Sequence, residues 1–169
     1  MPRVKIGILA VICVGIGTAI YLLAFRPPAS VPVSTSPTAT TKLPPTAIKI
    51  AKLGLNIPVQ AAVVRGNQWD MYDHSVAWLS TSAVPGEGNV ILYAHNRKGL
   101  FRDLYLLKPG DSVLIQQRDK WVTYVVDESR AVKDSDVNSV LSLDNRLTLF
   151  TCEGSFDQKR RVVYASLLQ

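Results

Sequence analysis

The chain has 169 residues, of which 47% are hydrophobic, and a formal net charge of +6; this length suits one ordinary domain with an additional segment. Residues 1–47 carry four basic residues and no acidic one, whereas the rest of the chain carries 15 basic and 13 acidic residues. Because the larger part is almost balanced in charge, it lacks the one-sided field of nucleic-acid-binding proteins, and that class is disfavoured.

The first predicted element is a membrane anchor. Residues 6–25 (IGILAVICVGIGTAIYLLAF) carry no charge, and as a helix they would span about 30 Å, the thickness of a bilayer core. Arg3 and Lys5 precede this run, so residues 1–5 are expected in the cytoplasm and the rest of the chain outside; Arg26 weakens this bias without reversing it. A cleaved signal peptide is the alternative, but the run is long and lacks a clear cleavage site.

A linker and a globular part follow the anchor. Residues 26–46 are dense in Pro, Ser and Thr, a composition that predicts an extended spacer. Residues 47–169 then form the globular part. Cys13 follows Ile12 rather than a small residue, so lipid attachment there is not expected. Cys152 is the only cysteine of the globular part, which excludes an intramolecular disulfide.

The globular part consists mostly of short predicted strands. Apolar or alternating runs bounded by turn residues lie at residues 47–53, 59–64, 89–94, 112–117, 121–130, 146–152 and 161–168. Short helices are predicted near residues 100–106 and 134–141. Strands at this spacing predict an all-β barrel or sandwich. The sequence contains no internal repeat, glycine-rich phosphate loop or zinc-type cysteine spacing.

Residues that could carry chemistry stand at the ends of three predicted strands. His95 directly follows the strand 89–94, Cys152 ends the strand 146–152, and Arg160 and Arg161 begin the last strand. A cysteine nucleophile needs a proton-transferring partner and a group that stabilises the oxyanion. Neighbouring strands of a barrel would bring these groups to one rim. From spacing alone, a buried thiol and a surface histidine remain the simpler interpretation.

Three sequence segments favour a catalytic role for these residues over the simpler interpretation. "TLFTC" (148–152) matches the TLxTC signature of sortases, the membrane-anchored cysteine transpeptidases of mainly Gram-positive bacteria. "PGEGNVILYAHN" (85–96) and "FRDLYLLKPGDSV" (101–113) are similar to the segments that contain and follow the catalytic histidine of that family. The resemblance covers residues 48–169 in order. It implies a sortase-like closed β-barrel of about eight strands, with short helices in the connections.

The resemblance also implies roles for individual residues. Cys152 corresponds to the nucleophile and His95 to the general acid and base. Thr151 corresponds to a substrate-binding or supporting residue. Ala94 stands where the family usually has Gly, a change expected to alter local packing without removing the function of the histidine. His74 falls outside the catalytic positions of the family and is expected to be structural or on the substrate side.

The catalytic arginine is assigned by alignment of the last strand. The family usually has a small residue five positions after this arginine, and Ala165 then selects Arg160. Its role would be to stabilise the oxyanion or the substrate. Arg161 would point to the opposite face of the strand and is the fallback.

A sortase cleaves a C-terminal sorting motif of the LPxTG type between Thr and Gly through a thioacyl enzyme. It transfers the protein to an amine of a peptidoglycan precursor or a pilin lysine. The implied partners are therefore surface proteins with a sorting signal and an amine acceptor. The sequence leaves the class open, closest to class A, D or E or to pilus types without a lid. A protease that releases its product to water and a non-catalytic, membrane-tethered binding module are the alternatives.

No cofactor is expected. Calcium is not expected either, because Asp134 and Asp136 are too few and too scattered, and either could cap a short helix. The three tryptophans, Trp69, Trp78 and Trp121, are expected to pack in or on the barrel rather than to bind a ligand.

Overall fold

The computed structural model describes residues 43–66, 68–141, 144–154 and 158–169. The predicted anchor and residues 26–42 of the predicted linker lie outside these ranges. Within them, no helix has the length and apolar character needed to cross a membrane.

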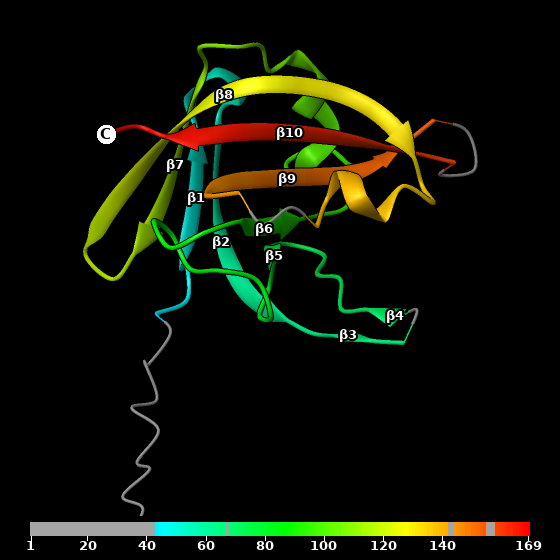
Figure 1. The fold of residues 1–169 in the computed structure, drawn as a ribbon, viewed down its shortest axis with the longest axis horizontal. Coiled ribbons are helices and arrows are strands. Elements are labelled where there is room, and N and C mark those ends of the chain that lie inside the picture. The colour runs from blue at the N-terminus through cyan, green and yellow to red at the C-terminus, as the bar shows by residue number, and fades with distance from the viewer. Residues whose placement is uncertain (1–42, 67, 142–143, 155–157) are drawn as a thin grey trace, which may run out of the picture. The chain divides into compact units, whose positions relative to one another are not determined.

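Eight strands form a closed barrel in the order β1-β2-β5-β6-β9-β10-β8-β7 (Figure 1). This result confirms the predicted all-β, eight-stranded barrel. A separate two-stranded sheet pairs β3 (Val64–Arg65) with β4 (Gln68–Trp69). The barrel strands are β1 (Ala47–Ile50), β2 (Leu55–Ala62), β5 (Val76–Leu79), β6 (Val90–Tyr93), β7 (Ser112–Gln117), β8 (Lys120–Lys133), β9 (Arg146–Glu153) and β10 (Lys159–Leu167).

In the described part of the connections there are three short 3₁₀ helices: η1 (Ala51–Leu53), η2 (Phe101–Leu106) and η3 (Val137–Ser139). The helix predicted at 100–106 is η2. The helix predicted at 134–141 is much shorter in the structure, where only the three residues of η3 are helical. Asp136 precedes this single turn and caps it. Its carboxylate accepts bonds from the backbone N–H and the hydroxyl of Ser139, at 3.3 and 2.5 Å.

Strand β5 escaped the sequence prediction. Its four residues, VAWL, are all buried, so they show no alternation between apolar and polar positions. β5 pairs in parallel with β2 and antiparallel with β6. β8 is longer than predicted because it pairs with β7 through its first part and with β10 through most of its length.

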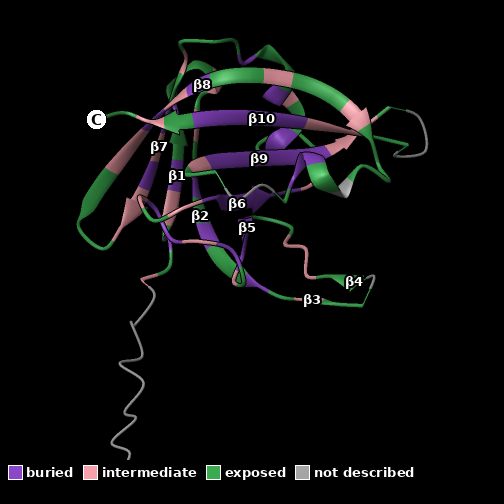
Figure 2. Ribbon diagram, viewed as in Figure 1, coloured by how far each residue is buried: buried purple, intermediate pink, exposed green. Residues whose placement is uncertain are grey.

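The sheet around β6 and β9 is buried on both faces (Figure 2). Val90, Leu92 and Leu149 face the barrel interior and join the main core. Ile91, Tyr93 and Phe150 face outward and join a second apolar cluster, against which Met71 and Tyr72 pack. The outer face of β9 is therefore covered too.

Candidate active site

Parallel pairing of β6 with β9 brings two strand ends together. Tyr93 is the register partner of Phe150. Two residues after this pair, the backbone reaches His95 on one side and Cys152 on the other. Because parallel strands run in the same direction, these two residues reach the same edge of the sheet. Their equal distance from the pair places them on the same face as the two rings.

Thr151 joins the two strand ends. Its hydroxyl donates a 2.8 Å hydrogen bond to the carbonyl oxygen of Ala94, and the N–H of Ala94 contacts the carbonyl oxygen of Phe150 at 3.4 Å. Thr151 is only 3% exposed. The residue before the cysteine thus holds the residue before the histidine, which fixes the two backbones against each other.

The last strand supplies the arginine. Arg160 is the register partner of Cys152, and Arg161 is the partner of Thr151. Residues directly opposite in an antiparallel pair project to the same face, so Arg160 lies on the face of Cys152 and Arg161 on the other. Arg161 forms a 2.6 Å ion pair with Glu153.

A cavity of about 430 Å³ lies on the outer face of these strands, within the size range of ligand-binding sites. His95, Cys152 and Arg160, the three candidate catalytic residues, all line it together with Thr151. The other lining residues include Trp69, Met71, Tyr93, Val140, Leu141 and Phe150. A candidate nucleophile and its two candidate partners thus line a mostly apolar pocket.

Two smaller, more polar cavities also reach Cys152. One, of about 260 Å³, is lined by Asp73, His95, Asn96, Arg97 and Cys152. Arg97 forms an ion pair with Asp73, and the hydrogen bond it donates holds the pKa of that carboxyl below its usual value. The other, of about 180 Å³, is lined by Asn96, Arg102, Tyr105, Thr151, Cys152, Glu153 and Arg161.

His74 is exposed and does not line any of these three cavities. Asp134 and Asp136 do line the large one. Among residues 43–66, 68–141, 144–154 and 158–169, no group of three or more His, Cys, Asp or Glu residues is placed to hold a metal ion.

The tryptophans have three different environments. Trp78 is 3% exposed and donates a hydrogen bond to the carbonyl oxygen of Ala83, so its predicted core position is confirmed. Trp121 is 42% exposed on β8. Trp69 packs edge to face on Tyr93 and Phe150 of the barrel, as predicted, but it is also 39% exposed and lines the large cavity. Its contribution could not be found from strand patterns, since it stands in a short sheet outside the barrel.

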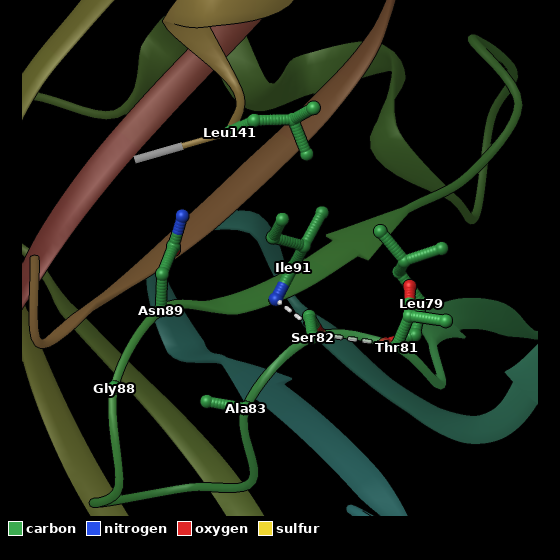
Figure 3. A pocket seen from close by; sticks show the side chains of 8 residues that line it. All are labelled: Leu79, Thr81, Ser82, Ala83, Gly88, Asn89, Ile91 and Leu141. Atoms are coloured by element: carbon green, nitrogen blue, oxygen red, sulfur yellow. Dashed lines mark hydrogen bonds between the residues drawn. The ribbon is translucent and has the colours of Figure 1, made fainter. Parts of the chain in front are cut away.

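A further cavity of about 350 Å³ lies beside the start of β6, with Leu141 on one side and Leu79, Ser82 and Ile91 on the other (Figure 3). The hydroxyl of Ser82 is engaged in the fold: it donates to the carbonyl oxygen of Leu79 and accepts from the N–H of Ile91. None of its lining residues is a cysteine, histidine or charged residue, so this cavity lacks the groups for acyl transfer.

Comparison with known proteins agrees with this arrangement. Sortase C1 from Streptococcus agalactiae is 25% identical, with a TM-score of 0.62 over 73% of this chain and 67% of the other. Listeria monocytogenes sortase A is 22% identical, with a TM-score of 0.64 over 73% and 86%. A Clostridium perfringens sortase D5 transpeptidase is 24% identical, with a TM-score of 0.62 over 75% and 79%.

These similarities extend to three sortase classes at nearly equal TM-scores, so the fold does not distinguish the class. A comparison with curated protein sequences found no match. The family model of the Sortase domain matches residues 48–168, which is most of the chain and nearly all of the described barrel. The chain therefore belongs to the sortase family.

Proposed function

We propose that this protein is a cysteine transpeptidase that cleaves an LPxTG-like sorting motif between Thr and Gly and joins the product to an amine. The observation that carries the proposal is that Cys152, His95 and Arg160 line one cavity at the ends of adjacent strands. Family membership supports the same chemistry.

In the first step, His95 takes the thiol proton of Cys152, and the sulfur attacks the carbonyl carbon of the motif threonine. Arg160, on the same face of the sheet as Cys152, stabilises the negative charge on the carbonyl oxygen. The C–N bond then breaks, and His95 donates a proton to the departing amine of glycine. The acyl part of the substrate remains on Cys152 as a thioester.

In the second step, an incoming amine attacks the thioester carbonyl. His95 accepts the proton of this amine, the C–S bond breaks, and the new amide leaves. The acceptor is an amine of a peptidoglycan precursor or a pilin lysine, and the donor is a surface protein with a C-terminal sorting signal. Both steps use only side chains of this chain and require no cofactor.

For location, we propose a single-pass anchor at residues 6–25, a linker at 26–46 and a catalytic domain at 47–169 outside the cytoplasm. The support is the uncharged run of residues 6–25, preceded by two basic residues. This arrangement would place the catalytic domain where exported substrates emerge.

The test is turnover of a fluorogenic peptide with an LPxTG motif. Cys152→Ala and His95→Ala should each abolish cleavage, because the first removes the nucleophile and the second the proton donor. His74→Ala is the matched control, since this exposed histidine does not line the cavities at Cys152, and it should cleave normally. Circular dichroism should show all three variants folded.

Retained turnover in either of the first two variants would contradict the assignment. Product analysis with and without an added oligoglycine amine then identifies the acceptor. A ligated product supports transpeptidation. Exclusive formation of the free acid, even with excess amine, would instead identify a protease that releases its product to water.

A further inference from the structure

We propose that Trp69 determines substrate specificity by forming the wall against which an apolar side chain of the acyl donor packs, on the N-terminal side of the scissile bond. The inference rests on the proposed function and adds to it a residue from outside the barrel strands. No sequence motif assigned a role in substrate recognition to this residue.

Three aromatic rings form the wall. Tyr93 and Phe150, from the paired strands β6 and β9, are stacked with ring centroids 5.2 Å apart. The ring of Trp69 stands almost perpendicular to both, with centroids 5.1 Å from Tyr93 and 5.7 Å from Phe150. These are favourable edge-to-face geometries, so the indole is held in place by the two strands that carry His95 and Cys152.

Hydrogen bonds and an ion pair also hold the segment that carries Trp69 in place. Asp70 accepts a 3.1 Å hydrogen bond from the backbone N–H of Val63 and forms an ion pair with Arg65. The hydroxyl of Tyr72 donates a 2.7 Å hydrogen bond to the carbonyl oxygen of Ala61 in β2. These bonds, from two residues that follow the indole, tie this segment to the end of β2 and to β3.

Exposure distinguishes this tryptophan from a packing residue. Trp78 is 3% exposed in the barrel core, whereas Trp69 remains 39% exposed although it touches two other rings. Trp69 also lines the large cavity, as do Met71 and Leu141. Apolar ring area left open toward a cavity is available to bury an apolar ligand group.

The wall is electrically neutral. Tyr93 is 1% exposed, and burial, with a smaller contribution from Asp70, raises its pKa to about 12. The phenol therefore stays protonated at physiological pH. An uncharged aromatic wall favours an aliphatic side chain over a charged one, because the three rings offer a charged group no ion-pair partner in exchange for its lost hydration. The charged residues of the cavity, Asp134, Asp136 and Arg160, lie on other elements.

The position of Cys152 indicates which half of the substrate lies there. Cys152 borders the large apolar cavity and two smaller polar ones. The acyl half stays in the site as a thioester between the two steps, whereas the leaving amine must be exchanged for another. We therefore assign the large apolar cavity to the acyl half and the polar cavities to the exchanging amines.

The test compares two peptides, one with the motif Leu-Pro-Ala-Thr-Gly and one with Ala-Pro-Ala-Thr-Gly. Trp69→Ala should lower kcat/KM for the leucine peptide by roughly tenfold or more, mainly through KM. It should change kcat/KM for the alanine peptide little, so that discrimination between the two collapses. Trp69→Phe should be intermediate. Trp121→Ala, which removes a comparably exposed indole from β8, is the matched control and should behave as wild type.

An equal loss on both peptides would mean that Trp69 only supports the fold, and no loss would mean that it is not the wall; either result overturns the inference. Binding is measured separately by tryptophan fluorescence in the Cys152→Ala protein. The leucine peptide should change the emission, and adding Trp69→Phe, but not Trp121→Phe, should remove the change. An unchanged emission would contradict the inference, even if the wild-type protein cleaved the peptide. Normal binding without cleavage by the wild-type protein would contradict only the proposed chemistry.

Discussion

The two neighbouring arginines of β10 have different surroundings and therefore different expected roles. Arg160 shares a face and a cavity with Cys152. Arg161 is bound to Glu153, and the side chains of this ion pair are 19% and 30% exposed. The first is placed to act on a substrate, and the second is placed to hold the ends of β9 and β10 together.

Replacement of each arginine should therefore give a different result. Arg160→Ala should lower kcat/KM on the order of a hundredfold, as removal of an oxyanion-stabilising group does, with little loss of stability. Arg161→Ala should destabilise the fold by about 1–2 kcal/mol, because Glu153 loses a charged hydrogen-bond partner. Peptide turnover and urea unfolding of both variants measure this. A larger loss of turnover in Arg161→Ala would transfer the catalytic role to that residue.

Thr151 acts on the site through the backbone. Thr151→Val should cost about 1–3 kcal/mol, because the buried carbonyl oxygen of Ala94 loses its hydroxyl donor. It should also lower kcat with little change in KM, because His95 is no longer held in place, whereas Thr151→Ser should restore both quantities. A change in KM alone would instead indicate direct contact with the substrate.

At the level of the elements, the site depends on the parallel pairing of β6 and β9. The loop before β6 sets where that strand begins. Within it, Gly88 has a φ of +122° and its N–H donates to the side-chain oxygen of Asn145, just before β9. This glycine therefore links the starts of the two strands.

Gly88→Ala should destabilise the protein by about 1–3 kcal/mol, because L residues rarely adopt this φ and the new Cβ would lie 3.1 Å from the Cβ of Ala83. Gly54→Ala is the control. Its φ of +64° lies in the left-handed helical region with no atom within 4 Å of the new Cβ, so it should cost only about 1 kcal/mol. Urea unfolding of both variants tests the order, and an equal cost would show that the contact with Ala83 relaxes freely.

At the level of the whole molecule, a closed barrel positions the candidate catalytic groups, and the proposed N-terminal anchor would hold that barrel at the membrane. The full-length chain should sediment with membranes and resist carbonate extraction, because an uncharged run of this length gains more from lipid than from water. Deletion of residues 6–25 should release the protein into the soluble fraction. Release of the full-length chain by carbonate would contradict the anchor.

The sequence by itself determined the strands that alternate or end in turn residues, and with them an all-β barrel or sandwich. Positions at strand ends made Cys152, His95, Arg160 and Arg161 candidates, and the family resemblance then assigned their roles and implied a closed barrel. The sequence pattern did not reveal β5, whose residues are buried on both faces and carry no periodic signal. It also overestimated the length of the helix near η3.

Only the tertiary structure decided which groups meet. The equal distances of His95 and Cys152 from the Tyr93–Phe150 pair become meaningful once β6 and β9 are known to be parallel neighbours. The register of β10 separates Arg160 from Arg161. Trp69 reaches the cavity from a segment between β2 and β5. Contacts between residues far apart in sequence arise from packing, and local patterns cannot encode them.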